Sequence, residues 1–344
     1  MKPLSLLIAS STLFVTSLST PLFADTTPPK ADADMQKVLD TLASLKGKPI
    51  EGLDPVAARI QPTPADAVKK LLQNSGKSTA PDASVSMKEI TIPGPVSPIP
   101  AYTFTPKGKG PFPVLVYYHG GGFVIADTKT YEASARALAK GANAVVLSVD
   151  YRQAPENKFP AAPDDAFAAY KWTLEHAKDI NGDAKRVAVG GESAGGNLAT
   201  VVSLMARDKS VQIPVHQLLV YPVVSDDMNS PSYKRNENAK PLNRDMMKWF
   251  FKHYAADPKS PYALPIKADS LKGLPSATII AAEIDPLLSE GKAYAERLKL
   301  EGVNVDYREY QGVTHEFFGM GAVVKKAKDA EDFASANLKK AFSK

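Results

Sequence analysis

Residues 189–199, VGGESAGGNLA, place one serine, Ser193, among small residues. A serine hydroxyl is a poor nucleophile unless the chain presents it sharply and a base lies beside it. The run before it, RVAVG (186–190), has the composition of a buried strand, and the segment 193–208 has that of a helix. Strand, tight turn and helix form the setting of a nucleophile elbow, so we predict that Ser193 is a nucleophile. The alternatives are a turn that is small only for packing, or a phosphate-binding loop, although GGESAGG has no Walker lysine.

A nucleophilic serine needs a base, and the chain has five histidines. His315 stands in GVTHEFF (312–318), in the loop after the last predicted strand, VNVDYREY (303–310). We expect it to be the base, because it alone reaches the sheet edge after the serine in chain order. The other four have different settings: His176 in a charged helix, His216 at the start of a strand, His253 in a later helix and His119 at the start of HGGGF.

A third group must orient the imidazole and stabilise its charged form. Asp285 stands just beyond the predicted strand ATIIAAE (277–283), and Pro286 fixes the chain after it. Glu283 lies two residues earlier and is the alternative partner. We favour Asp285 because it falls in the loop rather than at the strand end.

The run HGGGF (119–123) follows the apolar strand LVYY. Three consecutive glycines let backbone N–H groups approach a substrate oxygen closely. Two of these groups, together with the N–H of Ala194, are expected to hold the oxyanion of a tetrahedral intermediate. The alternative is a flexible surface loop.

Continuous apolar runs of strand length alternate with helix-length segments, which predicts an α/β fold with a mostly parallel central sheet and helices on both faces. The strand runs are 113–118, 144–149, 186–190, 216–222 and 277–283, after two alternating strands in 84–93 and 98–106. The helical segments are 130–140, which is expected to stop at Gly141, then 161–180, 193–208, 287–300 and 322–343.

Two regions break this alternation and are the candidates for a helical cap. Residues 25–84 hold two or three short helices within 35–75, and residues 224–256 form a polar loop followed by a helix rich in large apolar groups. The expected organisation is therefore N-terminal cap helices in 25–84 and a catalytic domain in 85–344 that carries the cap insertion 224–256.

Composition excludes several classes of site. The 344 residues carry 42 basic and 37 acidic side chains, a net charge of +5 with no dense basic block, so nucleic acid is not an expected partner. Without cysteine there are no disulfides, thiolate zinc sites or cysteine nucleophiles. Residues 1–24 have the order of a secretory signal peptide cleaved after Ala24, which predicts a periplasmic or secreted protein; an uncleaved anchor is the alternative. No other stretch is long and apolar enough to span a bilayer.

Taken together, these motifs resemble those of the bacterial hormone-sensitive-lipase-like esterases, the HGGG family (family IV) of α/β-hydrolases. The resemblance covers roughly residues 85–344. It implies a serine carboxylesterase for small acyl esters of short to medium chain, with no cofactor or metal, in a group whose members are often homodimers. The runs that carry it are HGGGF, DYRQAPE (150–156), FPAAPDDAFAAYKW (159–172), GGESAGGNLA (190–199), EIDPLLSEG (283–291) and GVTHEFF.

Matched motif by motif, the resemblance assigns Ser193 as nucleophile, His315 as base and Asp285 as its partner. It assigns Gly121, Gly122 and Ala194 as oxyanion donors, with His119 and Gly120 shaping the loop. It gives Asp150, Tyr151, Arg152 and Glu156 as buried polar support. Glu192, also a supporting residue, stands where many relatives carry aspartate.

The activity retains alternatives. The same scaffold serves lipases, amidases, lactonases, arylformamidases and peptidases, and the cap decides among them. A further alternative is a protein that binds a small ligand without turnover. Relatives of that kind have lost the base histidine, and His315 is present here.

Overall fold

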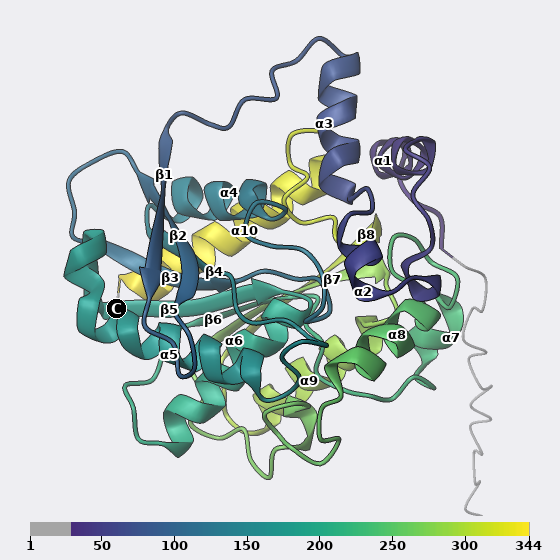
Figure 1. Ribbon diagram of the computed structural model, residues 1–344. Helices are drawn as coiled ribbons and strands as arrows, with labels where there is room; N and C mark the ends of the chain where they lie inside the picture. The colour runs from purple at the N-terminus through teal and green to yellow at the C-terminus, as the bar shows by residue number, and fades with distance from the viewer. Residues whose placement is uncertain (1–28, 344) are drawn as a thin grey trace, which may run out of the picture.

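The computed structural model describes residues 29–343, so the predicted signal peptide (1–24) lies outside the described residues. Within them, eight strands form one sheet in the order β1-β2-β4-β3-β5-β6-β7-β8 (Figure 1). The strands are β1 (Val85–Ile92), β2 (Ile99–Pro106), β3 (Phe112–Tyr118), β4 (Val145–Val149), β5 (Gly182–Glu192), β6 (Gln217–Val220), β7 (Ala277–Ile284) and β8 (Val305–Thr314).

The sheet is mostly parallel, as the apolar runs predict. Strand β2 pairs antiparallel with both β1 and β4, and every pairing from β4 onward is parallel. All residues of β3, β4 and β6 are buried, because helices cover both faces and leave no solvated side. The carboxyl ends of the parallel strands therefore meet at one edge.

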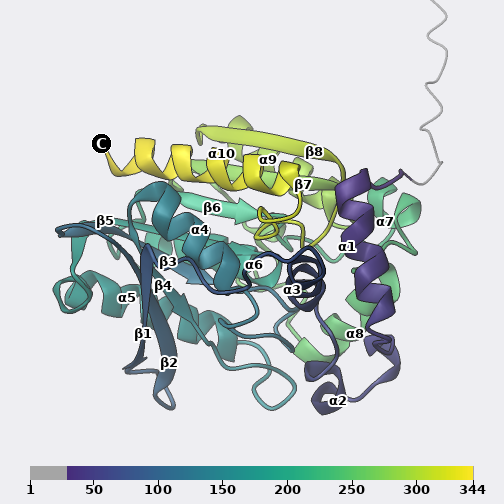
Figure 2. The ribbon, with the colours of Figure 1, turned by 90° about the horizontal axis from the view of Figure 1, so that it is seen from above.

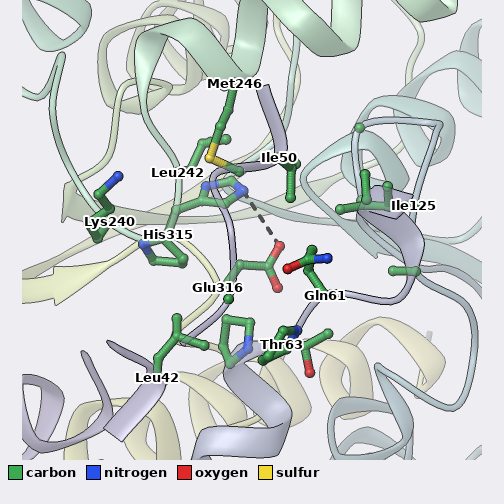
Figure 3. A pocket seen from close by; sticks show the side chains of 18 of the residues that line it. Leu42, Ile50, Gln61, Thr63, Ile125, Lys240, Leu242, Met246, His315 and Glu316 are labelled. Carbon is green, nitrogen blue, oxygen red and sulfur yellow. Dashed lines mark ion pairs between the residues drawn. The ribbon is translucent and has the colours of Figure 1, made fainter. Parts of the chain in front are cut away.

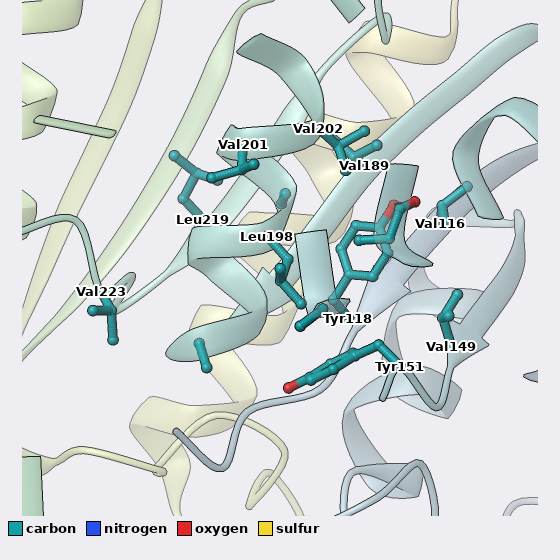
Figure 4. Close-up of a cluster of buried hydrophobic side chains, with 14 of the residues drawn as sticks. Val116, Tyr118, Val149, Tyr151, Val189, Leu198, Val201, Val202, Leu219 and Val223 are labelled. Atoms are coloured by element: carbon teal, nitrogen blue, oxygen red, sulfur yellow. Dashed lines mark hydrogen bonds between the residues drawn. The ribbon is translucent and has the colours of Figure 1, made fainter. Parts of the chain in front are cut away.

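Helices lie on both faces of the sheet (Figure 2). One face carries α4 (Glu132–Ala142) and α10 (Lys325–Phe342), and the other carries α5 (Ala161–His176), α6 (Ala194–Asp208) and α9 (Leu288–Leu300). Figure 4 shows the packing of α6 on the sheet, where Leu198, Val201 and Val202 meet Val116 and Val189. This core fixes the start of α6, directly after Ser193.

One predicted helix end is wrong. Helix α4 does not stop at Gly141 but continues to Ala142, and Asn143 ends it in the left-handed conformation at φ 51°. Gly141 has a packing role instead, because a Cβ at this position would overlap the Ser335 hydroxyl of α10. The glycine thus allows α4 and α10 to approach each other.

Short helices from two distant parts of the chain gather at one end of the molecule (Figures 1 and 2). The first group is α1 (Ala33–Ser44), η1 (Ile50–Gly52), α2 (Pro55–Arg59) and α3 (Pro64–Asn74), and the second is α7 (Pro231–Arg235) and α8 (Arg244–Tyr254). Two further 3-10 turns are η2 (Ala177–Ile180) and η3 (Pro265–Lys267). No helix within residues 29–343 has the length and apolarity needed to cross a membrane.

Candidate active site

Ser193 lies in a strained turn between β5 and α6. Its backbone has φ 56° and ψ −116°, a conformation that a non-glycine residue rarely adopts. The turn is held by the Ser193 N–H on the Val220 carbonyl at 2.9 Å and by the Val223 N–H on the Ser193 carbonyl at 3.2 Å. At Gly195 any Cβ would overlap the Tyr118 carbonyl oxygen, so the close approach of α6 to β3 requires glycine. The local geometry is that of a nucleophile elbow.

His315 is the first residue after β8, and its ring is joined to Asp285. The distance from His315 Nδ1 to Asp285 Oδ2 is 2.6 Å, and both side chains are buried. Asp285 Oδ1 also accepts the Leu287 N–H at 2.8 Å, which fixes the carboxylate. Glu283, the alternative partner, instead accepts the Gly312 N–H at 2.7 Å. Only Asp285 of the two is hydrogen-bonded to the histidine.

Opposing influences act on the pKa of His315. Burial lowers it, whereas the charge and hydrogen bond of Asp285 raise it, with further contributions from Glu316 and Glu192, and the net result is a raised pKa. The ring of Tyr221 lies against the imidazole at 4.4 Å between centroids. The imidazole is therefore fixed in position and strengthened as a base.

The HGGGF run forms a tight turn beside Ser193. The N–H groups of Val124 and Ile125 bond to the Gly121 carbonyl, and Gly121 and Gly122 have φ values of 102° and 59°. A Cβ on Gly122 would overlap the ring of Phe250 in α8. Gly121 and Gly122 therefore need to be glycine, and both line the same cavity as Ser193.

The other predicted site residues are buried behind this cavity wall. Ala194 begins α6 and is fully buried. His119 stacks on Tyr151 at 4.5 Å between ring centroids, and its Nδ1 lies 2.7 Å from the Gly120 carbonyl. Burial lowers the pKa of His119, and the Tyr151 hydroxyl donates to the His119 carbonyl at 2.9 Å. These contacts hold His119 and Gly120 in place within the loop.

Glu192 supports the site from beneath Ser193. Its carboxyl accepts hydrogen bonds from the hydroxyls of Tyr117, at 2.5 Å, and Tyr221. Burial raises the pKa of Glu192 to about 8. Since Tyr221 also packs on His315, the glutamate is connected to the base through one aromatic ring.

The polar run after β4 supports the site, but of its four predicted buried residues only Tyr151 is fully buried, whereas Asp150 and Arg152 are partly exposed and Glu156 is exposed. Asp150 accepts from the Thr128 N–H at 2.8 Å, and Arg152 donates twice to the buried Asp165. Glu156 is 52% exposed at its side chain and pairs with Arg59 at 2.7 Å. Its partner comes from the N-terminal helices, which sequence patterns could not place beside it.

A cavity of about 370 Å³ lies above the sheet edge (Figure 3). We call one side of the cavity the sheet wall, which comprises Gly121, Gly122, Ser193, His315 and Glu316. We call the other side the cap wall, defined as the residues of 39–64 and 240–250 that line the cavity. Its large apolar side chains are Leu39, Leu42, Ile50, Leu242, Met246, Met247 and Phe250. Among residues 29–343 no cluster of three or more His, Asp or Glu side chains is placed to hold a metal ion.

A few polar contacts hold the two halves of the cap wall. The Trp249 indole N–H donates to the Leu53 carbonyl at 3.0 Å and thereby joins α8 to the N-terminal segment. Arg59 donates to the carbonyls of Val124, at 2.8 Å, and Ala154, at 2.9 Å, in addition to its pairing with Glu156. Arg59 thus ties α2 to the loop that contains Gly121 and Gly122.

Sequence patterns missed Glu316 and Tyr131. Glu316 follows His315, has φ 68°, and its Oε1 lies 3.8 Å from His315 Nε2. The Tyr131 hydroxyl donates to that same oxygen at 2.6 Å. The only signal in the sequence was the position of Glu316 next to the predicted base.

Comparison with known proteins gives a consistent result. The model of a family described as having the alpha/beta hydrolase fold matches residues 115–319. The chain is 42% identical over 249 residues to the carboxylic ester hydrolase LipN of Mycobacterium tuberculosis, covering 70% of this chain and 66% of that protein. It is 36% identical over 310 residues to esterase LipI of the same organism, covering 88% and 92%. The crystal structure of a thermostable esterase from Pseudomonas putida superposes with a TM-score of 0.81 at 36% identity, covering 91% of this chain and 98% of that chain. The chain thus spans about two thirds of LipN and nearly all of LipI.

Proposed function

The chain belongs to the hormone-sensitive-lipase-like esterases of the α/β hydrolase fold, and from that premise we propose that it is a serine carboxylesterase. The observation that carries the proposal is the cavity shared by Ser193 and His315, with His315 held by Asp285 at 2.6 Å. A strained serine that lines the same cavity as a buried, carboxylate-bound imidazole is an arrangement that can make a hydroxyl nucleophilic.

The reaction proceeds in two steps. His315 Nε2 takes the proton of the Ser193 hydroxyl as Oγ attacks the ester carbonyl carbon, and the oxyanion forms against the backbone N–H groups of Gly121, Gly122 and Ala194. His315 then returns the proton to the leaving alcohol, and the acyl group remains on Ser193. Water, deprotonated by His315, attacks the acyl-enzyme and releases the acid. Asp285 keeps the imidazole in the required tautomer and stabilises its charged form.

We propose short- to medium-chain acyl esters as substrates. A cavity of about 370 Å³ lies at the lower end of the range for small-molecule sites. Its apolar cap wall suits a hydrocarbon chain, and Ser193, which lines the same cavity, is only 5% exposed. A true lipase needs a large apolar surface that opens on lipid.

The experiment is a series of p-nitrophenyl esters from acetate to palmitate, assayed with the mature protein and with Ser193→Ala. We expect fast hydrolysis of acetate to hexanoate, little hydrolysis of palmitate, and loss of activity by a factor on the order of 10⁴ or more in the variant. Equal rates in the two proteins would overturn the assignment of Ser193. A maximum at palmitate would favour a lipase.

We also propose that the protein is exported from the cytoplasm. This proposal rests on the sequence of residues 1–24, in which one lysine precedes an apolar run that is followed by Pro-Leu-Phe-Ala. N-terminal sequencing of the protein released by its native host should begin at Asp25. A blocked or uncleaved N-terminus in the membrane fraction would support an anchor instead.

A further inference from the structure

Glu316 places a carboxylate inside the cavity, next to the reacting groups. Its side chain is 22% exposed, and Figure 3 shows it turned toward the middle of the cavity between His315 and Gln61. The left-handed φ of 68° is an unfavourable conformation for glutamate. The Tyr131 hydroxyl holds Oε1 at 2.6 Å, so the carboxylate is fixed and cannot turn freely.

Little in the protein neutralises this carboxylate. Within residues 29–343 its ion pair is with His315, and no hydrogen bond reaches its second oxygen, Oε2. Of the basic residues that line the cavity, Lys48 and Lys240 are exposed to solvent, and Arg59 is bound to Glu156. The cavity therefore has largely apolar walls and two acidic side chains, Glu51 on the cap wall and Glu316 on the sheet wall, of which Glu316 lies next to His315 and has an oxygen open to a ligand.

In the proposed reaction, Glu316 lies close to the position of the alcohol part of the ester. In the proposed reaction His315 Nε2 gives a proton to the leaving alcohol oxygen, which must lie within about 3 Å of it. Glu316 Oε1 lies 3.8 Å from the same Nε2. A nitrogen two carbons beyond the alcohol oxygen lies roughly 3 to 4 Å from that oxygen, which brings it within reach of the carboxylate.

We propose that Glu316 selects esters of amino alcohols, in which a cationic nitrogen stands two carbons from the ester oxygen. This assignment rests on the proposed esterase function and names its substrate class. A cation here offsets the cost of a desolvated carboxylate, and the apolar walls, with the rings of Phe250 and Tyr131, accommodate alkyl groups on the nitrogen. The same carboxylate repels esters that carry an acidic group at this position.

The test compares two esters of the same shape, 2-(trimethylammonio)ethyl acetate and its uncharged counterpart 3,3-dimethylbutyl acetate. The measured quantity is the ratio of their kcat/KM values in the wild type and in Glu316→Gln. Glutamine keeps the size of the side chain and an oxygen for Tyr131. We expect the ratio to fall about tenfold or more in the variant, mainly through KM of the charged ester, while the uncharged ester changes less.

Glu51→Gln is the matched control, because Glu51 also lines the cavity but belongs to the cap wall. We expect it to leave the ratio within about twofold of the wild type, because among residues 29–343 the ion pair with His315 is made by Glu316, whereas Glu51 accepts a hydrogen bond from Asn243. Equal ratios in the wild type and Glu316→Gln would overturn the assignment. An equal fall of the ratio in Glu51→Gln would also overturn the assignment, because the preference would then come from the overall electrostatic potential of the cavity and not from Glu316.

The outcome separates this inference from the proposed function. Hydrolysis of p-nitrophenyl acetate and 3,3-dimethylbutyl acetate that depends on Ser193, but without preference for the cation, overturns only the role of Glu316. If none of the three esters is hydrolysed, or if hydrolysis survives Ser193→Ala, the proposed function itself is overturned, and the substrate class with it.

Discussion

The two sides of the cavity are built in different ways. The sheet wall takes its residues from the ends of β5 and β8 and from the loop after β3, and each has a buried hydrogen-bond partner or a close packing neighbour. The cap wall comes from residues 39–64 and 240–250, almost 200 positions apart, and is joined by a few contacts such as Trp249 on the Leu53 carbonyl. The sheet wall is therefore fixed by its packing in the core, whereas the cap wall is held by a few contacts between its two segments.

The two walls are therefore suited to different tasks: the sheet wall to the proposed reaction, and the cap wall to most of the contacts with the substrate. In the proposed reaction, proton transfer and oxyanion binding depend on distances within a few tenths of an ångström, and a rigid sheet edge is suited to hold such distances. The cap wall supplies apolar contacts that tolerate exchange of one side chain for another. Changes in the sheet wall other than at Glu316 should therefore act mainly on kcat, whereas changes at Glu316 and in the cap wall should act mainly on KM.

Among the changes that test this comparison, the largest effect is expected at Asp285. Asp285→Asn keeps the size of the side chain but removes the charge that stabilises the imidazolium, so kcat for p-nitrophenyl acetate should fall by a factor on the order of 10³ to 10⁴. Glu283→Gln is the control, because Glu283 stands two residues away and bonds to the Gly312 N–H. Comparable losses of kcat in the two variants would contradict the assignment of Asp285 as the partner of His315.

Gly122 lies where the two walls touch, so its substitution tests whether they act independently. Gly122→Ala should lower kcat on the order of 10²-fold, because the new Cβ overlaps the Phe250 ring and the backbone has a φ of 59°. Kinetics of the double variant Gly122→Ala with Phe250→Ala separate these causes. Recovery of part of kcat assigns the loss to the cap wall, and no recovery assigns it to the strained loop.

The sheet wall was largely predictable from sequence because it depends on local patterns. Ser193 follows a buried strand and starts a helix, and Asp285 and His315 follow buried strands whose carboxyl ends meet at one edge. The hydrogen bond between Asp285 and His315 joins the two predicted partners. The preference for Asp285 over Glu283 as the partner of His315 also followed from the sequence, because Glu283 lies within the strand.

The cap wall was not predictable in the same detail, because its contacts join segments that share no periodicity. No pattern places Arg59 beside Glu156, 97 residues away, and Glu156 was wrongly expected to be buried. Gly141 was read as a helix stop because glycine commonly ends helices, whereas its packing against Ser335 in α10 keeps it inside α4. Glu316 was overlooked because its importance depends on the direction of one side chain.

Arg59 links the N-terminal part of the cap wall to the loops after β3 and β4 through four hydrogen bonds. Arg59→Met keeps an apolar stem but loses the bonds to Val124, Ala154 and Glu156, so α2 should detach more often. We expect KM to rise about tenfold with a smaller change in kcat, and faster amide hydrogen exchange confined to α2 and its neighbours.

Glu156→Gln serves as the comparison, because the two backbone bonds of Arg59 remain. Its KM should rise no more than about threefold, in keeping with the small contribution of a largely exposed ion pair. A fall in kcat that exceeds the rise in KM in Arg59→Met would contradict the division of roles between the two walls.

The smallest effect concerns the stability of the sheet wall and its dependence on pH. Burial raises the pKa of Glu192 to about 8, whereas glutamate in an unfolded chain titrates near 4.3. Between these values the folded protein keeps a proton that the unfolded chain has lost, so the free energy of unfolding falls as pH rises and levels off above about pH 8. Glutamine does not titrate, so the Tm of Glu192→Gln should rise by a few degrees relative to that of the wild type between about pH 5 and pH 8.

Glu331, whose pKa burial raises to about 7, provides the comparison. The corresponding rise in the relative Tm of Glu331→Gln should level off about one pH unit earlier. A difference in Tm between Glu192→Gln and the wild type that stays constant with pH would mean that Glu192 is ionised beneath Ser193, and the sheet wall would then hold a buried charge rather than a neutral, hydrogen-bonded acid.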